Sequence, residues 1–286
     1  MQTRDLVFRA EDGTALCGWL SRPEGGSRHP LIVMTHGLSG LIDLGLARYA
    51  DHFVAAGFAC LAYDHRNWGR SDGWPRHESD PWIQVADMRD AISFARTLPE
   101  AEADRIGLWG TSYAGGHALV VTALDSRVRC AVSQVPFVSG NRNFGLWVPE
   151  EQREAVLALL ASDRDARARG ALPQTRPVAM PGDETERWIK RVDTDGIYPN
   201  LLTFRSLDLA RTYEPAAFAD RIASTPLLML VADEDVMTPP EWQLEAFDRI
   251  RGPKRLVRLR CGHYDMYTEH LPEAAQAATL WFADHL

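Results

Sequence analysis

Short runs of uninterrupted apolar residues alternate along this chain with segments of helical periodicity. The runs include PLIVMTH at 30–36, FACLAYD at 58–64 and PLLMLVA at 226–232. A strand that is buried on both faces has this pattern, because every one of its side chains meets apolar surroundings. Alternation of such strands with helices is typical of a mostly parallel sheet with helices on both faces. The sequence therefore predicts an α/β fold.

Local signals mark the ends of several of these elements. Asp12-Gly13 lies between two half-buried strands and predicts the turn of an N-terminal hairpin. Asp80-Pro81 suits the N-cap and the first turn of a helix. Thr238 and Glu241 match a capping box at the start of a later helix. Together these signals indicate where the loops at the strand ends lie.

The alternation is interrupted between Ser139 and Ala210. This stretch holds one helical pattern, at roughly 150–169, followed by several aromatic residues. Since a structureless loop of this length is rare in a compact domain, we expect a partly helical cap inserted between two strands of the sheet. The predicted division is a core over residues 1–138 and 211–286 and a cap over residues 139–210.

Composition narrows the classes of partner. The 286 residues include 31 Lys and Arg against 39 Asp and Glu, a formal net charge of −8. Proteins that track a phosphate backbone need the opposite balance, so we expect no nucleic-acid partner. No apolar segment has the length of a membrane span, and the N-terminal residues do not resemble a signal peptide. These observations predict a soluble, cytoplasmic protein without a membrane partner.

A serine lies between an apolar strand and the next helix, in GLWGTSYAGG at 107–116. Gly110 and Ala114, two residues before and after Ser112, are small enough for a sharp strand-to-helix turn. Such a turn lifts the hydroxyl above the carboxyl edge of the sheet, at a helix N-terminus that favours negative charge. We interpret Ser112 as a nucleophile, and the alternative is a serine that only shapes a tight turn.

A serine hydroxyl needs a base to take its proton. His263, in RCGHYD, follows the last strand and can reach over the same edge of the sheet, so it is the predicted base. Asp235, in VADEDVMTPP, follows the preceding strand and is predicted to orient His263, with Asp233 as the alternative acid. The chain order Ser112, Asp235, His263 is that of one serine-hydrolase fold and differs from the order in the others.

Other residues near Ser112 are candidates for holding the substrate. The turn in THGLSG exposes the backbone N–H of Leu38, and the helix start exposes that of Tyr113, so both are predicted to bind the oxyanion. Phe137, Phe144 and Trp147 follow the next strand and are predicted to face the substrate. The aromatic residues of the cap could equally line the pocket or form the cap's own core; they include Trp188, Tyr198 and Phe204.

The sequence carries no pattern that implies a metal or a cofactor. It has no HExxH motif and no clustered His and Asp at the spacing of metal ligands. HGLSG, after the first apolar strand, has the wrong spacing for a dinucleotide-binding loop. We therefore expect no metal and no cofactor.

Nearly the whole chain resembles the α/β-hydrolase superfamily. THGLSG resembles its oxyanion loop, WGTSYAGG its nucleophile elbow, and VADEDVMTPP and CGHYDMY its acid and histidine loops. YDHRNWGRSDGWPR resembles a loop that usually reads D-x-R-G-x-G-x-S, with Asn67-Trp68 where the family commonly has a glycine. ESDPW, SLDLARTYEPAAFADRI and TPLLMLVADED are similar to a branch near the dienelactone-hydrolase-like and polyketide-type hydrolases. This resemblance implies ester, lactone or thioester substrates.

The resulting hypothesis is a serine hydrolase that cleaves a small-molecule acyl substrate through an acyl-enzyme on Ser112. The same side chains could instead transfer the acyl group to an alcohol, amine or thiol, or hydrolyse a carbon–carbon bond. A protein that binds a ligand on this fold without turnover is the alternative outside enzymes. An intact set of three loops favours the enzyme, because a binding protein has no evident use for it.

Overall fold

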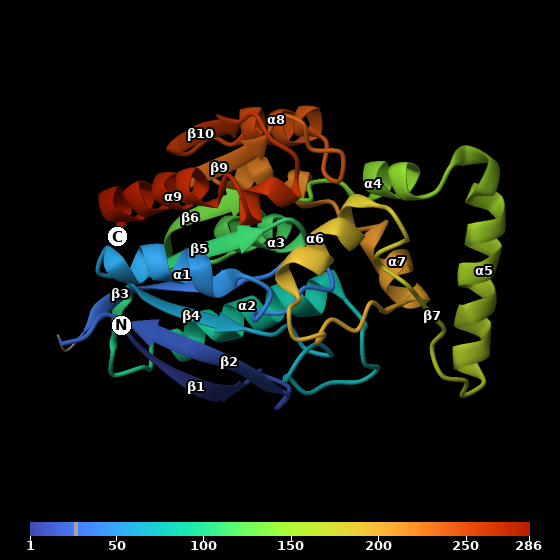
Figure 1. The fold of residues 1–286 in the computed structure, drawn as a ribbon, viewed down its shortest axis with the longest axis horizontal. Coiled ribbons are helices and arrows are strands. Elements are labelled where there is room, and N and C mark those ends of the chain that lie inside the picture. Colours follow the sequence, from blue (N-terminus) through green and yellow to red (C-terminus); the bar gives the residue numbers. More distant parts are fainter. Residues whose placement is uncertain (26–27) are drawn as a thin grey trace.

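A computed structural model describes residues 1–25 and 28–286, which form an eight-stranded sheet flanked by helices (Figure 1). The strand order is β1-β2-β4-β3-β5-β6-β9-β10. Their bounds are β1 (Gln2–Arg9), β2 (Ala15–Arg22), β3 (His29–Thr35), β4 (Ala59–Tyr63), β5 (Ala101–Thr111), β6 (Val128–Gln134), β9 (Leu227–Ala232) and β10 (Lys254–Leu259). β1 and β2 form the predicted antiparallel hairpin. The neighbours among β4, β3, β5, β6, β9 and β10, in this order across the sheet, pair in parallel. The predicted α/β fold is confirmed.

The central strands are apolar on both faces because each face meets its own core. Along β3, Leu31 and Val33 belong to one apolar cluster, whereas Ile32 and Met34 belong to another. The first cluster lies between the sheet and helices α2 (Pro81–Ala95) and α3 (Tyr113–Leu124). The second lies against α1 (Leu46–Ala55) and α9 (Leu271–His285). The alternation of side chains along a strand thus fills both cores at once.

Two predicted helix starts have different outcomes. Asp80 is the N-cap of α2, as predicted, and its carboxylate accepts hydrogen bonds from the N–H groups of Trp82 and Ile83. The predicted capping box at Thr238 is wrong. With Thr238 as the N-cap, the helix would begin at Pro239, but α8 (Pro240–Arg249) begins one residue later. A residue that precedes proline is pushed out of the helical region, so Pro239 cannot be the first helical residue. The Thr238 hydroxyl is therefore free for another contact.

Between β6 and β9 the chain leaves the sheet and forms additional elements. They are α4 (Gly140–Trp147), α5 (Glu150–Ala168), β7 (Thr175–Arg176), α6 (Glu184–Val192), β8 (Leu202–Thr203) and α7 (Phe204–Ala210), followed by η1 (Pro215–Arg221). The helix expected near 150–169 is confirmed as α5. In Figure 1, α6 and α7 lie at one end of the sheet and α5 stands outermost. We retain residues 139 and 210 as the proposed limits of the cap.

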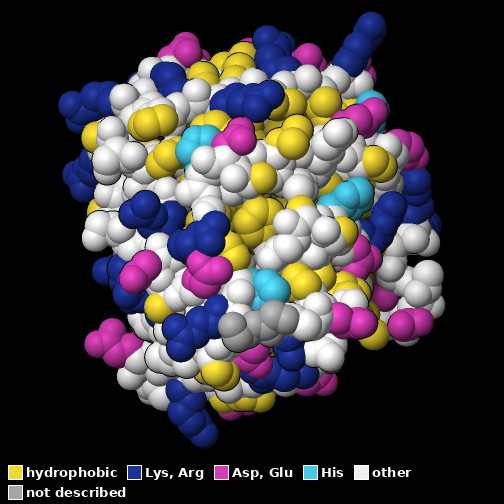
Figure 2. Space-filling view, turned by 90° about the vertical axis from the view of Figure 1, so that its left-hand side faces the viewer, with side chains coloured by type: hydrophobic (Ala, Val, Ile, Leu, Met, Phe, Trp, Pro, Cys, Tyr) yellow, Lys and Arg dark blue, Asp and Glu magenta, His cyan; other side chains and the backbone are white. Residues whose placement is uncertain are grey.

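The end of the molecule away from α6 and α7 has a mixed surface. Basic, acidic and apolar side chains are interspersed over the face that Figure 2 shows. Across residues 1–25 and 28–286, none of the helices is both long and apolar enough to cross a membrane.

Candidate active site

Ser112 lies on a strained turn between β5 and α3. Its backbone has φ 55° and ψ −119°, a conformation that costs energy in a residue with a side chain. A side chain at Gly110 would collide with the carbonyl oxygen of Ala114, and one at Gly116 would collide with that of Phe137. Ala114 is fully buried, so its methyl group fits where the usual motif has glycine. The predicted strand–serine–helix turn is confirmed.

The structure brings the side chains of Ser112, His263 and Asp235 together from three loops. Nε2 of His263 is 3.1 Å from Oγ of Ser112, and Nδ1 of His263 is 2.7 Å from Oδ2 of Asp235. These loops follow β5, β10 and β9, respectively. His263 and Asp235 are 3% and 4% exposed, so water competes little for these contacts. Since the carboxylate accepts from Nδ1–H, the lone pair of Nε2 faces the serine.

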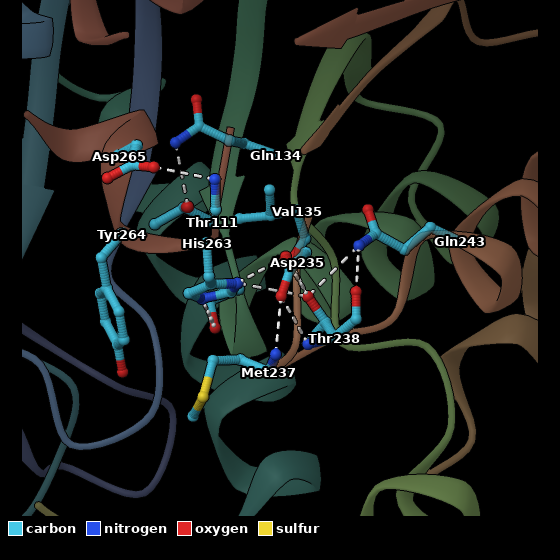
Figure 3. A network of polar contacts seen from close by, with 12 residues as sticks. Thr111, Gln134, Val135, Asp235, Met237, Thr238, Gln243, His263, Tyr264 and Asp265 are labelled. Atoms are coloured by element: carbon cyan, nitrogen blue, oxygen red, sulfur yellow. Dashed lines mark hydrogen bonds and ion pairs between the residues drawn. The ribbon is translucent and has the colours of Figure 1, made fainter. Parts of the chain in front are cut away.

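The carboxylate of Asp235 is held by four donors (Figure 3). Oδ1 accepts from the backbone N–H groups of Met237 and Thr238, each at 2.8 Å. Oδ2 accepts from the Thr238 hydroxyl at 2.9 Å and from His263. This network fixes the orientation of the carboxylate toward the imidazole.

The alternative acid, Asp233, lies elsewhere. Its Oδ1 accepts a hydrogen bond from Nε of Arg258 at 2.7 Å, and both side chains are partly exposed. Of the two carboxylates that the sequence left open, Asp235 is the one in contact with His263.

The loop after β3 passes close to Ser112. A Cβ placed on Gly37 would lie 3.0 Å from Cβ of Ser112, so glycine permits this approach. Leu38 and Tyr113, the predicted oxyanion donors, both line the same cavity as Ser112. Within residues 1–25 and 28–286, neither of their N–H groups donates a hydrogen bond to another group. Both donors are therefore available to a ligand.

The side chain of His36 holds this loop, a role that the sequence did not reveal. The backbone N–H of His65 donates to Nε2 of His36 at 3.1 Å, so the ring proton is on Nδ1. Nδ1–H then donates to the carbonyl oxygen of Gly37 at 2.9 Å. Because the C=O and N–H of a trans peptide point in opposite directions, this bond also sets the direction of the Leu38 N–H.

Three buried histidines lie together beneath the loop. The rings of His36 and His65 are 4.5 Å apart, and those of His65 and His117 are 5.8 Å apart. His117 contacts the Tyr213 hydroxyl at 2.9 Å and Oε1 of Gln84 at 3.0 Å. Burial lowers the pKa of His36 and His65, and it lowers the pKa of His117 to about 3. All three rings are therefore neutral at neutral pH.

We expect the free energy of unfolding to fall as the pH drops below about 6.5, where unfolded histidines gain protons. Between about 6.5 and the lowered pKa of His117, about 3, the unfolded chain binds the extra proton, so acid favours unfolding. Each such histidine should contribute about 1.4 kcal/mol per pH unit. Urea unfolding at a series of pH values measures this slope.

The matched variants for this slope are His117→Gln and His52→Gln, since His52 is exposed on α1. His117→Gln should reduce the acid slope by about one proton, and His52→Gln should not. An equal slope in wild type and His117→Gln would contradict the assignment.

A cavity of about 520 Å³ opens above Ser112. Phe137 and Trp147 line it, whereas Phe144 packs against Val148, Leu160 and Leu207 instead. The structure thus does not bring Phe144 to the site. The aromatic side chains that line the cavity are Tyr113, Phe137, Trp147, Trp188, Tyr198, Tyr264 and Tyr267. Of the cap aromatics whose role the sequence left open, Trp188 and Tyr198 reach the cavity, and Phe204 packs beside Phe144 in the cap.

Polar contacts join the insertion, the segment between β6 and β9 that contains the predicted cap, to the loops of the site. The Tyr198 hydroxyl lies 2.7 Å from Oγ of Ser39, next to Leu38. The Tyr264 hydroxyl, one residue after His263, lies 2.7 Å from Oγ1 of Thr185 on α6. Trp188 stacks on Tyr264 with ring centroids 5.0 Å apart. The insertion therefore forms a roof over the cavity.

Comparison with known proteins gives consistent matches over most of the chain. The model of a family described as X-Pro dipeptidyl-peptidase (S15 family) matches residues 12–265. The quorum-quenching protein AidA of Acinetobacter baumannii is 31% identical over 273 residues, which cover 92% of this chain and 88% of that protein. The polyketide transferase claH of Penicillium crustosum is 32% identical over 268 residues, with 88% and 86% covered. The crystal structure of the α/β-hydrolase GrgF from Penicillium sp. sh18 superposes with a TM-score of 0.88 at 26% identity, covering 100% of this chain and 99% of that one.

Proposed function

Because the chain belongs to the S15 family, within the α/β-hydrolases, we propose that it cleaves an ester, lactone or thioester through an acyl-enzyme on Ser112. One observation carries this proposal: Ser112, His263 and Asp235 are linked by contacts of 3.1 and 2.7 Å beneath an apolar cavity. This geometry suits a serine nucleophile, a base that receives its proton, and a carboxylate that orients the base.

In the proposed reaction, Oγ of Ser112 attacks the acyl carbonyl while Nε2 of His263 takes the hydroxyl proton. Asp235 stabilises the imidazolium that forms. The N–H groups of Leu38 and Tyr113 bind the oxyanion, and each donor should lower the barrier by about 3–4 kcal/mol. The imidazolium then protonates the leaving group, and water, activated by His263, releases the acyl group.

The walls of the cavity around Ser112 favour an apolar acyl group, and the charged lining residues, Arg176, Asp183, Glu184 and Arg187, all lie on the insertion. An X-Pro dipeptidyl substrate has a cationic N-terminus, which calls for a carboxylate in the site. Among the described lining residues, the carboxylates are Asp183 and Glu184, both on the insertion. Both oxygens of Asp183 are already acceptors, from the N–H groups of Met180 and Glu186. Around Ser112 the lining is mostly aliphatic and aromatic.

Hydrolysis of p-nitrophenyl esters of graded acyl length, with labelling by a serine-directed phosphonate, tests the proposal. We expect kcat/KM to rise from acetate toward medium-length acyl groups, because each buried methylene contributes about 0.8 kcal/mol. Trp147→Ala enlarges the cavity and should move the optimum to a longer chain. Trp74, which is 71% exposed, gives the control variant Trp74→Ala, with an unchanged optimum. A profile that does not depend on acyl length would contradict this use of the cavity.

Acyl transfer is the second candidate function. Two observations favour it: the relative claH is named a polyketide transferase, and the insertion forms a roof over part of the cavity. Adding alcohol, amine and thiol acceptors to the ester assay distinguishes the two reactions. Formation of the acylated acceptor in preference to the free acid would identify a transferase.

A further inference from the structure

The Thr238 side chain lies at the centre of the buried network behind His263, and the proposed mechanism does not use it (Figure 3). Its Oγ1 is 2.9 Å from Oδ2 of Asp235 and 3.4 Å from Nδ1 of His263. It is also 3.1 Å from the carbonyl oxygen of Val135. The residue is 4% exposed. A hydroxyl is thus in contact with both partners of the acid–base pair.

Neighbouring residues orient this hydroxyl. The side-chain amide of Gln243, which is fully buried, donates to the carbonyl oxygen of Thr238, and its Nε2 is 3.3 Å from Oγ1. Nε2 of Gln243 and Nδ1–H of His263 are donors, so the single hydroxyl proton must go to an acceptor. The acceptors in reach are Oδ2 of Asp235 and the carbonyl oxygen of Val135. Of these, the Asp235 oxygen is the nearer and the more strongly charged, so it attracts the proton more.

We propose that Thr238 is a positioning residue that sets how strongly His263 holds its proton. The inference rests on the proposed function of Ser112, Asp235 and His263. A hydroxyl that donates to Oδ2 takes up part of the negative charge that would otherwise face the imidazolium. It also prevents rotation of the carboxylate, because Oδ2 is then fixed from two sides. Thr238 thereby makes His263 give up its proton more readily after Ser112 has been deprotonated.

The test is the pH dependence of kcat/KM for ester hydrolysis in Thr238→Val and Thr238→Ser. Thr238→Val keeps the side-chain volume but removes the hydroxyl. Its acidic limb should move to higher pH by about half to one unit, with a loss of about tenfold in kcat. Thr238→Ser keeps the hydroxyl and should keep the wild-type profile. Thr122→Val is the matched control, because Thr122 is a buried threonine whose hydroxyl has no partner among the described residues.

A second readout does not depend on turnover. The Nδ1–H of His263 should give a low-field proton resonance, which Thr238→Val shifts and Thr238→Ser and Thr122→Val leave in place. If Thr238→Val folds poorly, Thr238→Ala provides the same comparison with a smaller side chain.

The outcomes separate this inference from the proposed function. The inference is supported if the acidic limb of the pH profile moves in Thr238→Val or Thr238→Ala and stays in place in Thr238→Ser and Thr122→Val. Unchanged limbs, or equal movement in Thr238→Ser and Thr122→Val, overturn it. If wild type and Ser112→Ala hydrolyse esters equally, the proposed function fails, and the resonance then decides the role of Thr238 by the same criterion.

Discussion

Replacing Ser112 by alanine should lower kcat for ester hydrolysis by about a million-fold, the scale found when a serine nucleophile is removed. Without Oγ no acyl-enzyme forms, and His263 has no hydroxyl to deprotonate. Residual rate above the uncatalysed reaction would come from the oxyanion donors and from binding. The measurement is the initial rate with p-nitrophenyl esters, together with mass spectrometry after phosphonate treatment. Wild type should gain one phosphonyl group, and the variant should gain none.

Ser93→Ala is a suitable control, since Ser93 is exposed on α2, where its hydroxyl donates to the carbonyl oxygen of Arg89 and accepts from Nη1 of Arg127. This variant should retain wild-type rates and labelling. Thermal unfolding of both variants establishes that a lost rate is not a lost fold. Activity that persists in Ser112→Ala would remove the nucleophile from the proposal and leave Ser112 as a residue that shapes the turn.

Replacing Asp235 by asparagine should lower kcat by about ten-thousand-fold, the scale known for the equivalent change in a serine protease. The amide keeps the shape of the side chain, but its NH2 group cannot accept from Nδ1–H of His263. The ring then favours the tautomer with its proton on Nε2, which cannot receive a proton from Ser112. Steady-state kinetics on the same esters measures the loss.

Asp233→Asn is the matched control, because it makes the same chemical change two residues away. Asp233 pairs with Arg258, and both side chains are partly exposed, so this pair contributes little to stability. We expect rates within about twofold of wild type. The reverse result, with Asp233→Asn inactive and Asp235→Asn active, would show that the acid had been assigned to the wrong carboxylate.

The sequence predicted those parts of the site that depend on local patterns. Ser112, Asp235 and His263 each follow a predicted strand, and the carboxyl ends of parallel strands meet at one edge of a sheet. Three loops far apart in the chain could therefore be placed together without a structure. Their distances and the choice between Asp233 and Asp235 required the coordinates.

Other features depend on tertiary contacts that leave no local signal. The bond from the His65 backbone to His36 joins residues 29 positions apart, and the contact of Thr238 with Val135 spans 103 positions. The spacing of Thr238 and Glu241 matches a helix capping box, but the two prolines that follow Thr238 place the start of α8 one residue later. Phe144 and Trp147 lie on the same short helix, and only the packing of α4 decides which of them reaches the cavity.

The position of the insertion has a consequence for how such a protein can diversify. The chain leaves the sheet after β6 and returns at β9, and these two strands are neighbours that pair in parallel. The two ends of the insertion are held side by side, because the N–H of Gly140 donates to the carbonyl oxygen of Tyr213 and the N–H of Ala216 donates to that of Val138. The length of the insertion can therefore change without altering the register of the sheet. Residues from the insertion form much of the cavity wall, whereas Ser112, Asp235 and His263 lie outside it. Recombination of one contiguous gene segment can thus exchange selectivity while the reactive groups are inherited unchanged.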